Sequence, residues 1–222
     1  MNAPGGHEPP DIAGALGALP LFPLPNAVLF PGAFLPLHVF EPRYRAMVKD
    51  VLQGHRALAV VMITDEAHRD EHGHPGIAEM AGVGVIVDHV ELPGGRYDIL
   101  LRGRARVRLR ELQFDPPYRR ADAQIVNASS EDVPPTEVMA LMSSASAFVA
   151  VLDKAHRGFE LRLPNNAAPG TLADLCAHQL VIDARERQVI LETMDVRTRV
   201  RRVAEALVVQ RLAFGSGDRD LN

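Results

Sequence analysis

Seven acidic and histidine side chains crowd one short segment of the chain. They are Asp65, Glu66, His68, Asp70, Glu71, His72 and His74. Imidazole and carboxylate groups at such spacing are ligands of transition metals, so a metal site is one interpretation. No cysteine and no distant ligand pair accompanies them, and nothing nearby fixes a coordination geometry. A solvated loop between two strands is the simpler interpretation, and we predict neither a metal nor a cofactor.

Arginine occupies every second position in another segment: Arg102, Arg104, Arg106, Arg108 and Arg110. Because side chains alternate across a strand, we expect all five on one face and the small or apolar residues between them on the other. Such a face could contact phosphates, which makes RNA binding the alternative function. The net charge of -4 and the aromatic content of 5% argue against it, because single-strand binders offer aromatic stacking platforms. A solvated sheet face is the simpler interpretation.

Residues that could support catalysis are few. No G-x-x-x-x-G-K-[ST] motif is present to cradle ATP phosphates. The two lysines, Lys49 and Lys154, lie beside no nucleophile motif, and the sequence around Ser216 is not a G-x-S-x-G elbow. The single cysteine, Cys176, sits in an apolar helical pattern typical of a packed core thiol. We therefore predict that the protein is not an enzyme, with a stand-alone hydrolase as a remote alternative.

An apolar, proline-punctuated segment from Phe22 to Phe40 is the best candidate for binding another chain. Much of it must be core, but proline-interrupted strands leave backbone edges that can take an extended peptide by strand addition. We hypothesise that exposed members of this segment line a peptide groove. The candidates are Phe30, Phe34 and His38. Burial in the core is the more frequent fate of such side chains.

The elements that must position these residues change in character near residues 129–135, a polar stretch that ends in two prolines. The chain has 222 residues, and 47% of them are hydrophobic, which is enough for a core without disulfides. The first part predicts extended segments over 27–30 and 34–40, a helix over 42–53, a buried strand over 57–63, a hairpin over 83–101, and strands over 102–110 and 118–128. Short strands with little helix favour a closed or partly closed antiparallel barrel.

The second part predicts a bundle of four helices. The first covers 138–155, and the others begin at Thr171, Asp183 and Asp195. Thr171 and Asp183 are each followed three residues later by an acidic residue, as in a capping box.

Several short motifs occur in a fixed order along the chain. They are residues 19–24 (LPLFPL), 30–32 (FPG), 35–37 (LPL), 40–44 (FEPRY), 82–84 (GVG), 103–107 (GRARV), 172–174 (LAD), 187–192 (RQVILE) and 195–199 (DVRTR). This ordered set, over about residues 16 to 214, resembles the N-terminal substrate-recognition domain family of Lon protease.

The resemblance implies an α+β fold in which a PUA-like antiparallel β-barrel lobe is followed by an α-helical bundle lobe. The expected boundaries are a disordered tail over 1–15, the barrel over 16–130, the bundle over 131–214 and a second tail over 215–222. It also implies a non-catalytic module that binds unfolded or extended polypeptide, and an adaptor for a protease or chaperone is the role that we expect. We expect a free-standing form without ATPase or peptidase domains.

The expected location is the cytoplasm, because a single thiol cannot form an internal disulfide. Residues 12–40 contain no Asp, Glu, Lys or Arg, but five prolines interrupt them, so we expect no membrane partner. Nucleic acid is likewise not an expected partner.

Overall fold

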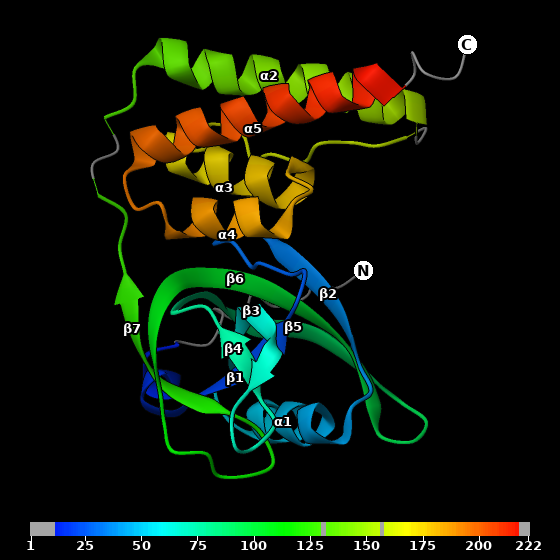
Figure 1. Ribbon diagram of the computed structural model, residues 1–222, viewed down its shortest axis with the longest axis vertical. Helices are drawn as coiled ribbons and strands as arrows, with labels where there is room; N and C mark the ends of the chain where they lie inside the picture. Colours follow the sequence, from blue (N-terminus) through cyan, green and yellow to red (C-terminus); the bar gives the residue numbers. More distant parts are fainter. Residues whose placement is uncertain (1–11, 130–131, 156–157, 218–222) are drawn as a thin grey trace, which may run out of the picture.

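The computed structural model describes residues 12–129, 132–155 and 158–217, which form two stacked lobes (Figure 1). The first lobe contains the 3-10 helix η1 (Ala13–Ala18), β1 (Leu19–Leu24), β2 (Phe34–Val39), α1 (Pro42–Gln53), β3 (Ala57–Arg69), β4 (Pro75–Ile77), β5 (Met80–Leu92), β6 (Arg96–Glu111) and β7 (Arg120–Val126). The second contains α2 (Pro135–Ala155), α3 (Pro169–Leu180), α4 (Ala184–Glu192) and α5 (Val196–Gly217). The predicted α+β order, strands first and helices second, is confirmed.

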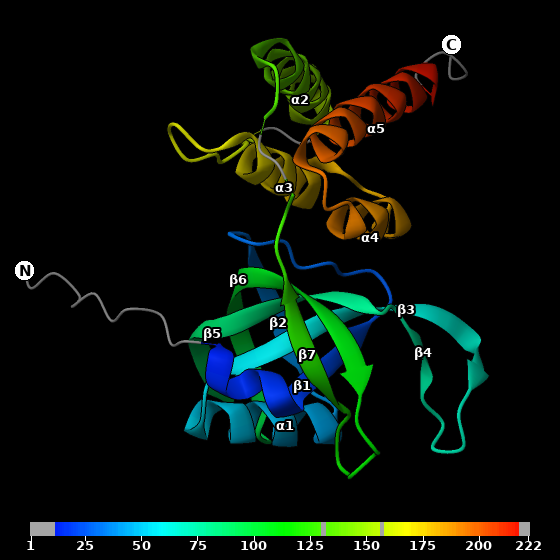
Figure 2. The ribbon, with the colours of Figure 1, turned by 90° about the vertical axis from the view of Figure 1, so that its left-hand side faces the viewer.

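Five strands of the first lobe close into a barrel. The sheet order is β1-β7-β6-β5-β3-β4, and β1 pairs back with β3 to complete the ring. We predicted an antiparallel barrel. The β1–β3 pair is the exception, because it is parallel, with Leu21 opposite Ala59. Beyond the ring, β4 and the end of β3 project from the barrel as a ribbon (Figure 2). Strand β2 pairs only with β6 among the described strands, so its other edge is unpaired.

The elements that the sequence pattern predicted most clearly contribute buried side chains to the core of the first lobe. Residues 57–62 of β3 are all buried, as expected of a continuous apolar run. Helix α1 covers one end of the barrel and buries Tyr44, Met47, Val48 and Val51, which is the face that its periodicity predicts. The β5–β6 hairpin also forms as predicted, through a turn in which Gly94 and Gly95 have positive φ.

The segment from Ala27 to Phe30 does not form the predicted strand. It crosses the barrel so closely that a Cβ at Gly82 would overlap the carbonyl of Leu29, and one at Gly103 would overlap the carbonyl of Phe30. These contacts explain why glycine stands at both strand positions. The strand β1 that precedes this segment was not predicted, because it contains Pro20 and Pro23, and proline is uncommon inside strands.

The helical lobe corrects two of the predicted helix starts. Helix α2 begins at Pro135 rather than Val138, and α3 begins at Pro169 rather than Thr171. Proline is favoured in the first helical turn because its missing N–H is not needed there. Thr171 therefore lies inside α3 and is not a cap.

The other two helix starts are confirmed. The carboxylate of Asp183 accepts the backbone N–H of Glu186 at 2.7 Å, and that of Asp195 accepts the backbone N–H of Thr198 at 2.7 Å. Each bond satisfies a backbone donor that has no partner within its helix.

The fold extends further toward both ends than the predicted tails allow. Ile12 and Ala15 are buried, although we assigned residues 1–15 to a tail, and α5 continues to Gly217. Residues 1–11 and 218–222 lie outside the described part of the chain, so the tail predictions there stay untested.

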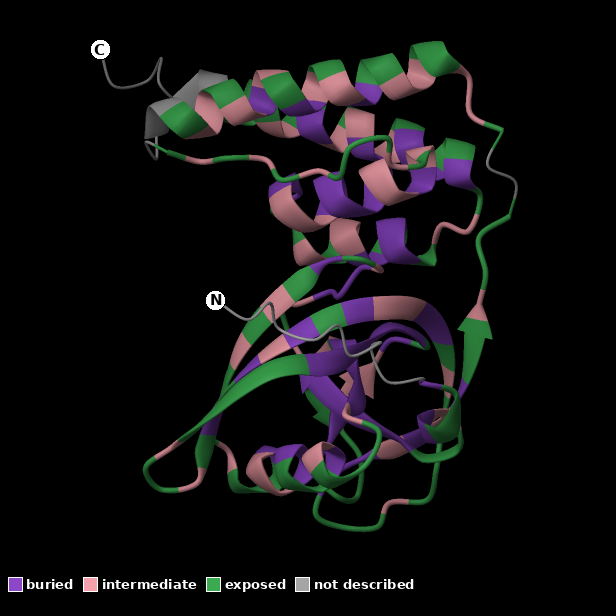
Figure 3. Ribbon diagram, turned by 180° about the vertical axis from the view of Figure 1, so that it is seen from behind, coloured by how far each residue is buried: buried purple, intermediate pink, exposed green. Residues whose placement is uncertain are grey.

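One helix in the described residues, α2, is long and apolar enough to cross a membrane by length and composition, with a mean hydropathy of 1.4 over Pro135–Asp153. In this fold α2 lies along α5 at the far end of the helical lobe, where it buries Leu141, Ala145 and Phe148. The opposite sides of these helices are largely exposed (Figure 3).

Candidate functional site

A buried ion network fixes the helical lobe to the barrel. The guanidinium of Arg106 on β6 donates two hydrogen bonds to the carboxylate of Asp174 on α3, one of them 2.9 Å long. On α5, Arg199 places its Nε 3.0 Å from the same carboxylate. All three side chains are at most 5% exposed. One strand and two helices thus meet at a single carboxylate.

Backbone carbonyls at the end of α4 complete this network. Arg106 Nε donates to the carbonyl of Leu191 at 2.8 Å, and Arg199 Nη1 donates to that of Thr193 at 2.7 Å. Two positive guanidinium groups share one negative carboxylate, which leaves one excess positive charge. The carbonyls lie at the negative end of the α4 dipole and partly offset that charge. The network holds the two lobes in one arrangement and therefore fixes the shape of the space between them.

A groove of about 760 Å³ opens where the lobes meet. Its lining comes from the start of β2, from the strap that we define as residues 159–164, and from α3. The principal apolar side chains in it are Phe34, Phe159, Leu161, Leu163 and Leu175. Polar groups reach it from Arg162, His178 and Gln179. The groove is thus mainly apolar with a few polar groups, as small-molecule and peptide sites usually are.

The strap is held extended by a side chain that pairs with its backbone. The amide of Gln179 on α3 accepts the N–H of Arg162 at 3.0 Å and donates to the carbonyl of Arg162 at 2.9 Å. Within the strap, half-buried apolar residues alternate with the exposed Glu160 and Arg162. This period of two is that of a strand, so one side of the strap presents Phe159, Leu161 and Leu163 as a row.

His178 joins α3 to the beginning of β2. Its Nε2 lies 3.0 Å from the carbonyl oxygen of Phe34 and must donate, because a carbonyl oxygen only accepts. Burial lowers the pKa of His178, which favours the neutral imidazole at physiological pH. The ring of Phe34 remains 52% exposed, so it forms an open wall of the groove.

The unpaired edge of β2 starts at this groove. The carbonyl of Ala33 accepts the N–H of Gly103 on the β6 side, whereas that of Phe34 points to His178 on the opposite side. Because backbone groups alternate along an antiparallel strand, those of Pro36 and His38 also point away from β6. The carbonyl of Phe34 already accepts from His178, and proline has no N–H, so this edge offers an N–H at Phe34, a carbonyl at Pro36 and both groups at His38.

The three predicted groove residues have different outcomes. Phe34 lines the groove. Phe30 has no exposed surface and packs edge-on to the His178 ring, with 6.3 Å between ring centroids, so its predicted place in a peptide groove is wrong. His38 is exposed, but it lies further along β2, where its Nδ1 is 2.6 Å from Asp98, and it does not line the groove.

The strap and Gln179 were missed by sequence reasoning. A signal was present, because the run Phe159-Glu160-Leu161-Arg162-Leu163 alternates apolar and charged residues. We assigned this stretch to the break between two helices, and a short alternating run with no partner strand gives no indication of what it packs against.

Known proteins resemble this chain over most of its length. The sequence profile described as "ATP-dependent protease La (LON) substrate-binding domain" matches residues 18–209. The chain belongs to this family. A Lon protease from Roseiflexus castenholzii is 34% identical over 210 residues, which cover 92% of this chain and 25% of that protein. Lon protease 2 from Myxococcus xanthus is 32% identical over 198 residues, which cover 85% of this chain and 23% of that protein. The chain thus spans about a quarter of the length of these relatives.

Two solved structures share the fold. A Lon N-terminal domain protein from Xanthomonas campestris has a TM-score of 0.61 at 24% identity, covering 82% of this chain and 94% of that one. The N-terminal domain of the Mycobacterium avium complex Lon protease has a TM-score of 0.62 at 15% identity, covering 86% and 98%. Both confirm the barrel-then-helices architecture of the Lon substrate-binding domain.

In this Lon substrate-binding domain the arginine strand does not form the solvated basic face that we expected. Arg106 is buried against α3, and Arg110 pairs with Asp122 at 2.8 Å on β7. Val107 faces the core as predicted, but a register shift in β6 between Gly103 and Ala105 interrupts the alternation. Arg102 lies opposite Val85 and Arg106 opposite Gly82, so the prediction that all five arginines share one face is wrong. The helical lobe covers Arg106. Arg102 lies with its guanidinium carbon 5.8 Å from the ring centroid of Phe34, at the rim of the groove. Arg104 is partly exposed, and Arg108 is exposed.

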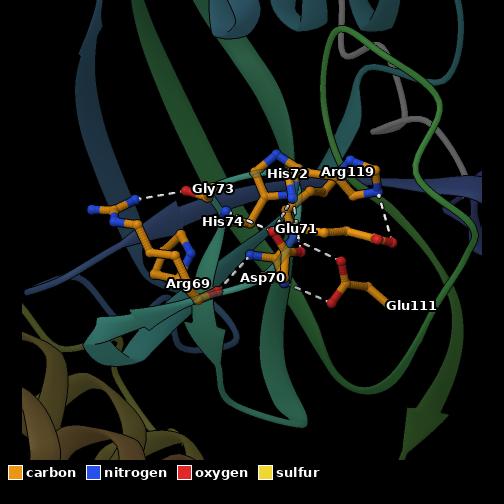
Figure 4. Close-up of polar contacts among 9 residues, drawn as sticks. Arg69, Asp70, Glu71, His72, Gly73, His74, Glu111 and Arg119 are labelled. Carbon is orange, nitrogen blue, oxygen red and sulfur yellow. Dashed lines mark hydrogen bonds and ion pairs between the residues drawn. The ribbon is translucent and has the colours of Figure 1, made fainter.

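The histidine-rich segment is more ordered than the predicted loop. Strand β3 continues to Arg69, and Asp70 then accepts the backbone N–H groups of His72 and His74 at 2.9 and 2.8 Å in a tight turn (Figure 4). These hydrogen bonds, with that of His74 foremost, lower the pKa of Asp70. The ring of His74 packs edge-on against Phe114. Within the described residues, no group of three or more His, Cys, Asp or Glu side chains is arranged to hold a metal ion.

Cys176 is fully buried in α3, and burial raises its pKa to about 12. The thiol is therefore protonated and shielded at physiological pH, which excludes it as a nucleophile in this conformation.

Proposed function

We propose that this chain binds unfolded or extended polypeptide in the groove between its lobes, without catalysing a reaction. The observation that carries the proposal is the position of Phe34, which is half exposed, lines the groove and begins the unpaired edge of β2. A bound chain could therefore place apolar side chains in the groove while its backbone pairs with the strand edge.

The groove suits an extended chain better than a compact ligand. The row of Phe159, Leu161 and Leu163 on the strap repeats every second residue, as do the outward side chains of an extended peptide. Burying one large apolar side chain contributes about 1.5–3 kcal/mol. Two or three such contacts offset part of the cost of ordering a peptide, so we expect dissociation constants in the micromolar range.

The chemistry of the groove supports binding without bond cleavage. None of the described residues that line it is a serine, threonine or cysteine. The one imidazole, His178, already donates its Nε2 proton to the carbonyl of Phe34. A nucleophile with a neighbouring base is what hydrolysis of a peptide bond would need.

We further propose a role as an adaptor that presents polypeptide to a protease or chaperone in the cytoplasm. The family's description as a substrate-binding domain of Lon supports the link to proteolysis. The single buried cysteine is compatible with a reducing compartment.

The experiment that tests the proposal compares an unfolded and a folded form of the same probe protein. Reduced, carboxymethylated α-lactalbumin and native α-lactalbumin are titrated against the chain by fluorescence anisotropy. We expect saturable binding of the unfolded form alone. A photo-cross-linker placed at the exposed Arg162 should capture it, whereas one placed at the exposed Met139 on α2 should not. Equal binding of both forms, or cross-links only at Met139, contradicts the proposal.

A further inference from the structure

A second groove, of about 550 Å³, lies between α1 and the β5–β6 hairpin. Residues of α1 form one wall, and His89, Glu91, Gly95 and Tyr97 from the hairpin form the other. Because β2 runs directly into α1, this groove lies at the far end of β2 from the groove between the lobes. We call it the basic groove, for the charges described next.

Two cations of α1 face into the basic groove. Arg45 and Lys49 are four residues apart, so they lie one above the other on the same side of the helix. The opposite side of α1 is the buried face that carries Met47, Val48 and Val51. The helix therefore places both charges toward the hairpin.

Neither cation has a carboxylate partner among the described residues. No Asp or Glu there lies within 4.0 Å of the charged group of Arg45 or Lys49, whereas the neighbouring Arg43 pairs with Glu41 at 2.9 Å. The Nε of Arg45 is buried and has no hydrogen-bond partner in the part of the chain that the structure describes. The positive charge of Arg45 thus lacks a countercharge among these residues, and an anion bound in the groove would supply one.

The hairpin turn keeps space open next to this guanidinium. Gly95 has a φ of +70°, and a Cβ built on it would lie 3.9 Å from the guanidinium carbon of Arg45. A side chain at this position would reach further across the groove. The glycine leaves bare backbone facing Arg45, so a small anionic group can approach it.

We propose that the basic groove binds a single carboxylate of a polypeptide, either an acidic side chain or the C-terminal carboxylate. Arg45 and Lys49 provide two positive charges, and Glu91 is the one carboxylate among the described lining residues. A small positive excess favours one carboxylate over a polyanion such as RNA. The planar guanidinium offers the paired N–H groups that a carboxylate accepts.

This carboxylate site deepens the proposed function and rests on it. The six residues of β2 span about 20 Å, which an extended peptide can follow from Phe34 to the basic groove. A single bound chain would then have apolar residues between the lobes and a carboxylate beside Arg45.

Three labelled peptides test the site by anisotropy. All share one extended segment of alternating Leu and Ser. The first has an amidated C-terminus and no acid, the second has a free C-terminal carboxylate, and the third is amidated with one Asp near its end. We expect one of the two carboxylate peptides to bind about tenfold more tightly than the first, and which one it is identifies the source of the carboxylate.

The double variant R45Q/K49Q should abolish that tenfold difference. The matched control R108Q/R211Q removes two exposed arginines elsewhere and should preserve it. Equal affinity of the wild type for all three peptides, or an equal loss in both double variants, overturns the proposal.

A separate probe distinguishes failure of this site from failure of peptide binding in general. Acetate, which presents a carboxylate without either source's surroundings, is titrated into the isotope-labelled protein and should shift the amide resonances of Gly95 and Tyr97 in the wild type and not in R45Q/K49Q. Such shifts together with no binding of any peptide would retain the carboxylate site and refute the proposed function. Binding of the amidated peptide without any shift would refute the carboxylate site alone.

Discussion

Arg106 and Asp174 join the barrel to the helical lobe through two parallel hydrogen bonds, and each side chain is only 5% exposed. Arg106 lies on β6 and Asp174 on α3, so this is a contact between lobes rather than within one. Because Arg199 approaches the same carboxylate, Asp174 contacts both arginines, whereas each arginine contacts only this one carboxylate in the network. The three residues should therefore differ in what their loss does to stability.

Replacement of Asp174 by Asn should cost about 3–5 kcal/mol in the free energy of unfolding, because two buried guanidinium groups lose their countercharge. Arg106→Met should cost less, since Asp174 keeps Arg199. Arg108→Met, on the same strand but exposed, should change stability by less than about 0.5 kcal/mol. Urea denaturation of the three variants measures the order, and an Arg106→Met variant less stable than Asp174→Asn would contradict it.

Gly103→Ala should destabilise the barrel by more than about 2 kcal/mol, because the added Cβ would overlap the carbonyl of Phe30 on the segment that crosses the barrel. Gly17→Ala serves as the control, since a Cβ there meets no atom within 4 Å. Thermal unfolding of the two variants compares them. Equal melting temperatures would mean that the crossing segment does not pack on β6 as described.

The pairing of Glu137 with α5 should contribute stability that depends on pH. Hydrogen bonds from Arg197 and Arg201 lower the pKa of Glu137 from its usual 4.5 to about 2. A lowered native pKa gives a contribution that is complete above pH 4.5 and is lost as pH falls toward 2. The wild type should thus exceed Glu137→Gln in urea midpoint at pH 6, and the gap should narrow below pH 4.5.

The control for this titration is Glu66→Gln, which removes an exposed carboxylate that has no ion pair with any described residue. Its midpoint should follow that of the wild type over the whole range. A gap between wild type and Glu137→Gln that stays constant from pH 6 to the acid transition would show that the carboxylate charge is not the source of the stability.

Cys176 should resist thiol reagents in the folded protein. Its thiol is buried and its pKa is raised to about 12, so almost no thiolate forms at pH 8. Ellman's reagent should react at once in denaturant and only at the rate of opening under native conditions. Rapid reaction of the native protein would place the thiol near the surface.

The spacing of apolar residues predicted the elements that bury either one face or all of their side chains. The β3 strand, the buried face of α1 and the β5–β6 hairpin all followed from residues close together in the sequence. The β1 strand and the crossing segment did not, because Pro20 and Pro23 mask the first, and contacts with Gly82 and Gly103, more than fifty residues further along the chain, determine the second. Propensity is local, whereas these contacts join distant segments.

The candidate groove was predictable only in part for the same reason. Phe34 was named because of its apolar, proline-rich neighbourhood, but no local feature separates it from Phe30, which is fully buried. The regular spacing of arginines predicted a common side of β6, but a register shift beside Arg104 interrupts the alternation, and no local signal marks it. Only the position of Asp174 on a distant helix shows that Arg106 is covered. The extended conformation of the strap could not be predicted, because it depends on hydrogen bonds with Gln179 on α3.

The most direct test of the central claim is the affinity of Phe34→Asp for reduced, carboxymethylated α-lactalbumin, measured by anisotropy beside Met139→Asp. Both variants place a charge on an exposed apolar position, but only Phe34 lines the groove between the lobes. We predict that Phe34→Asp weakens binding at least about tenfold, equivalent to about 1.4 kcal/mol, while Met139→Asp binds like the wild type. Wild-type affinity in a folded Phe34→Asp variant would contradict polypeptide binding in this groove.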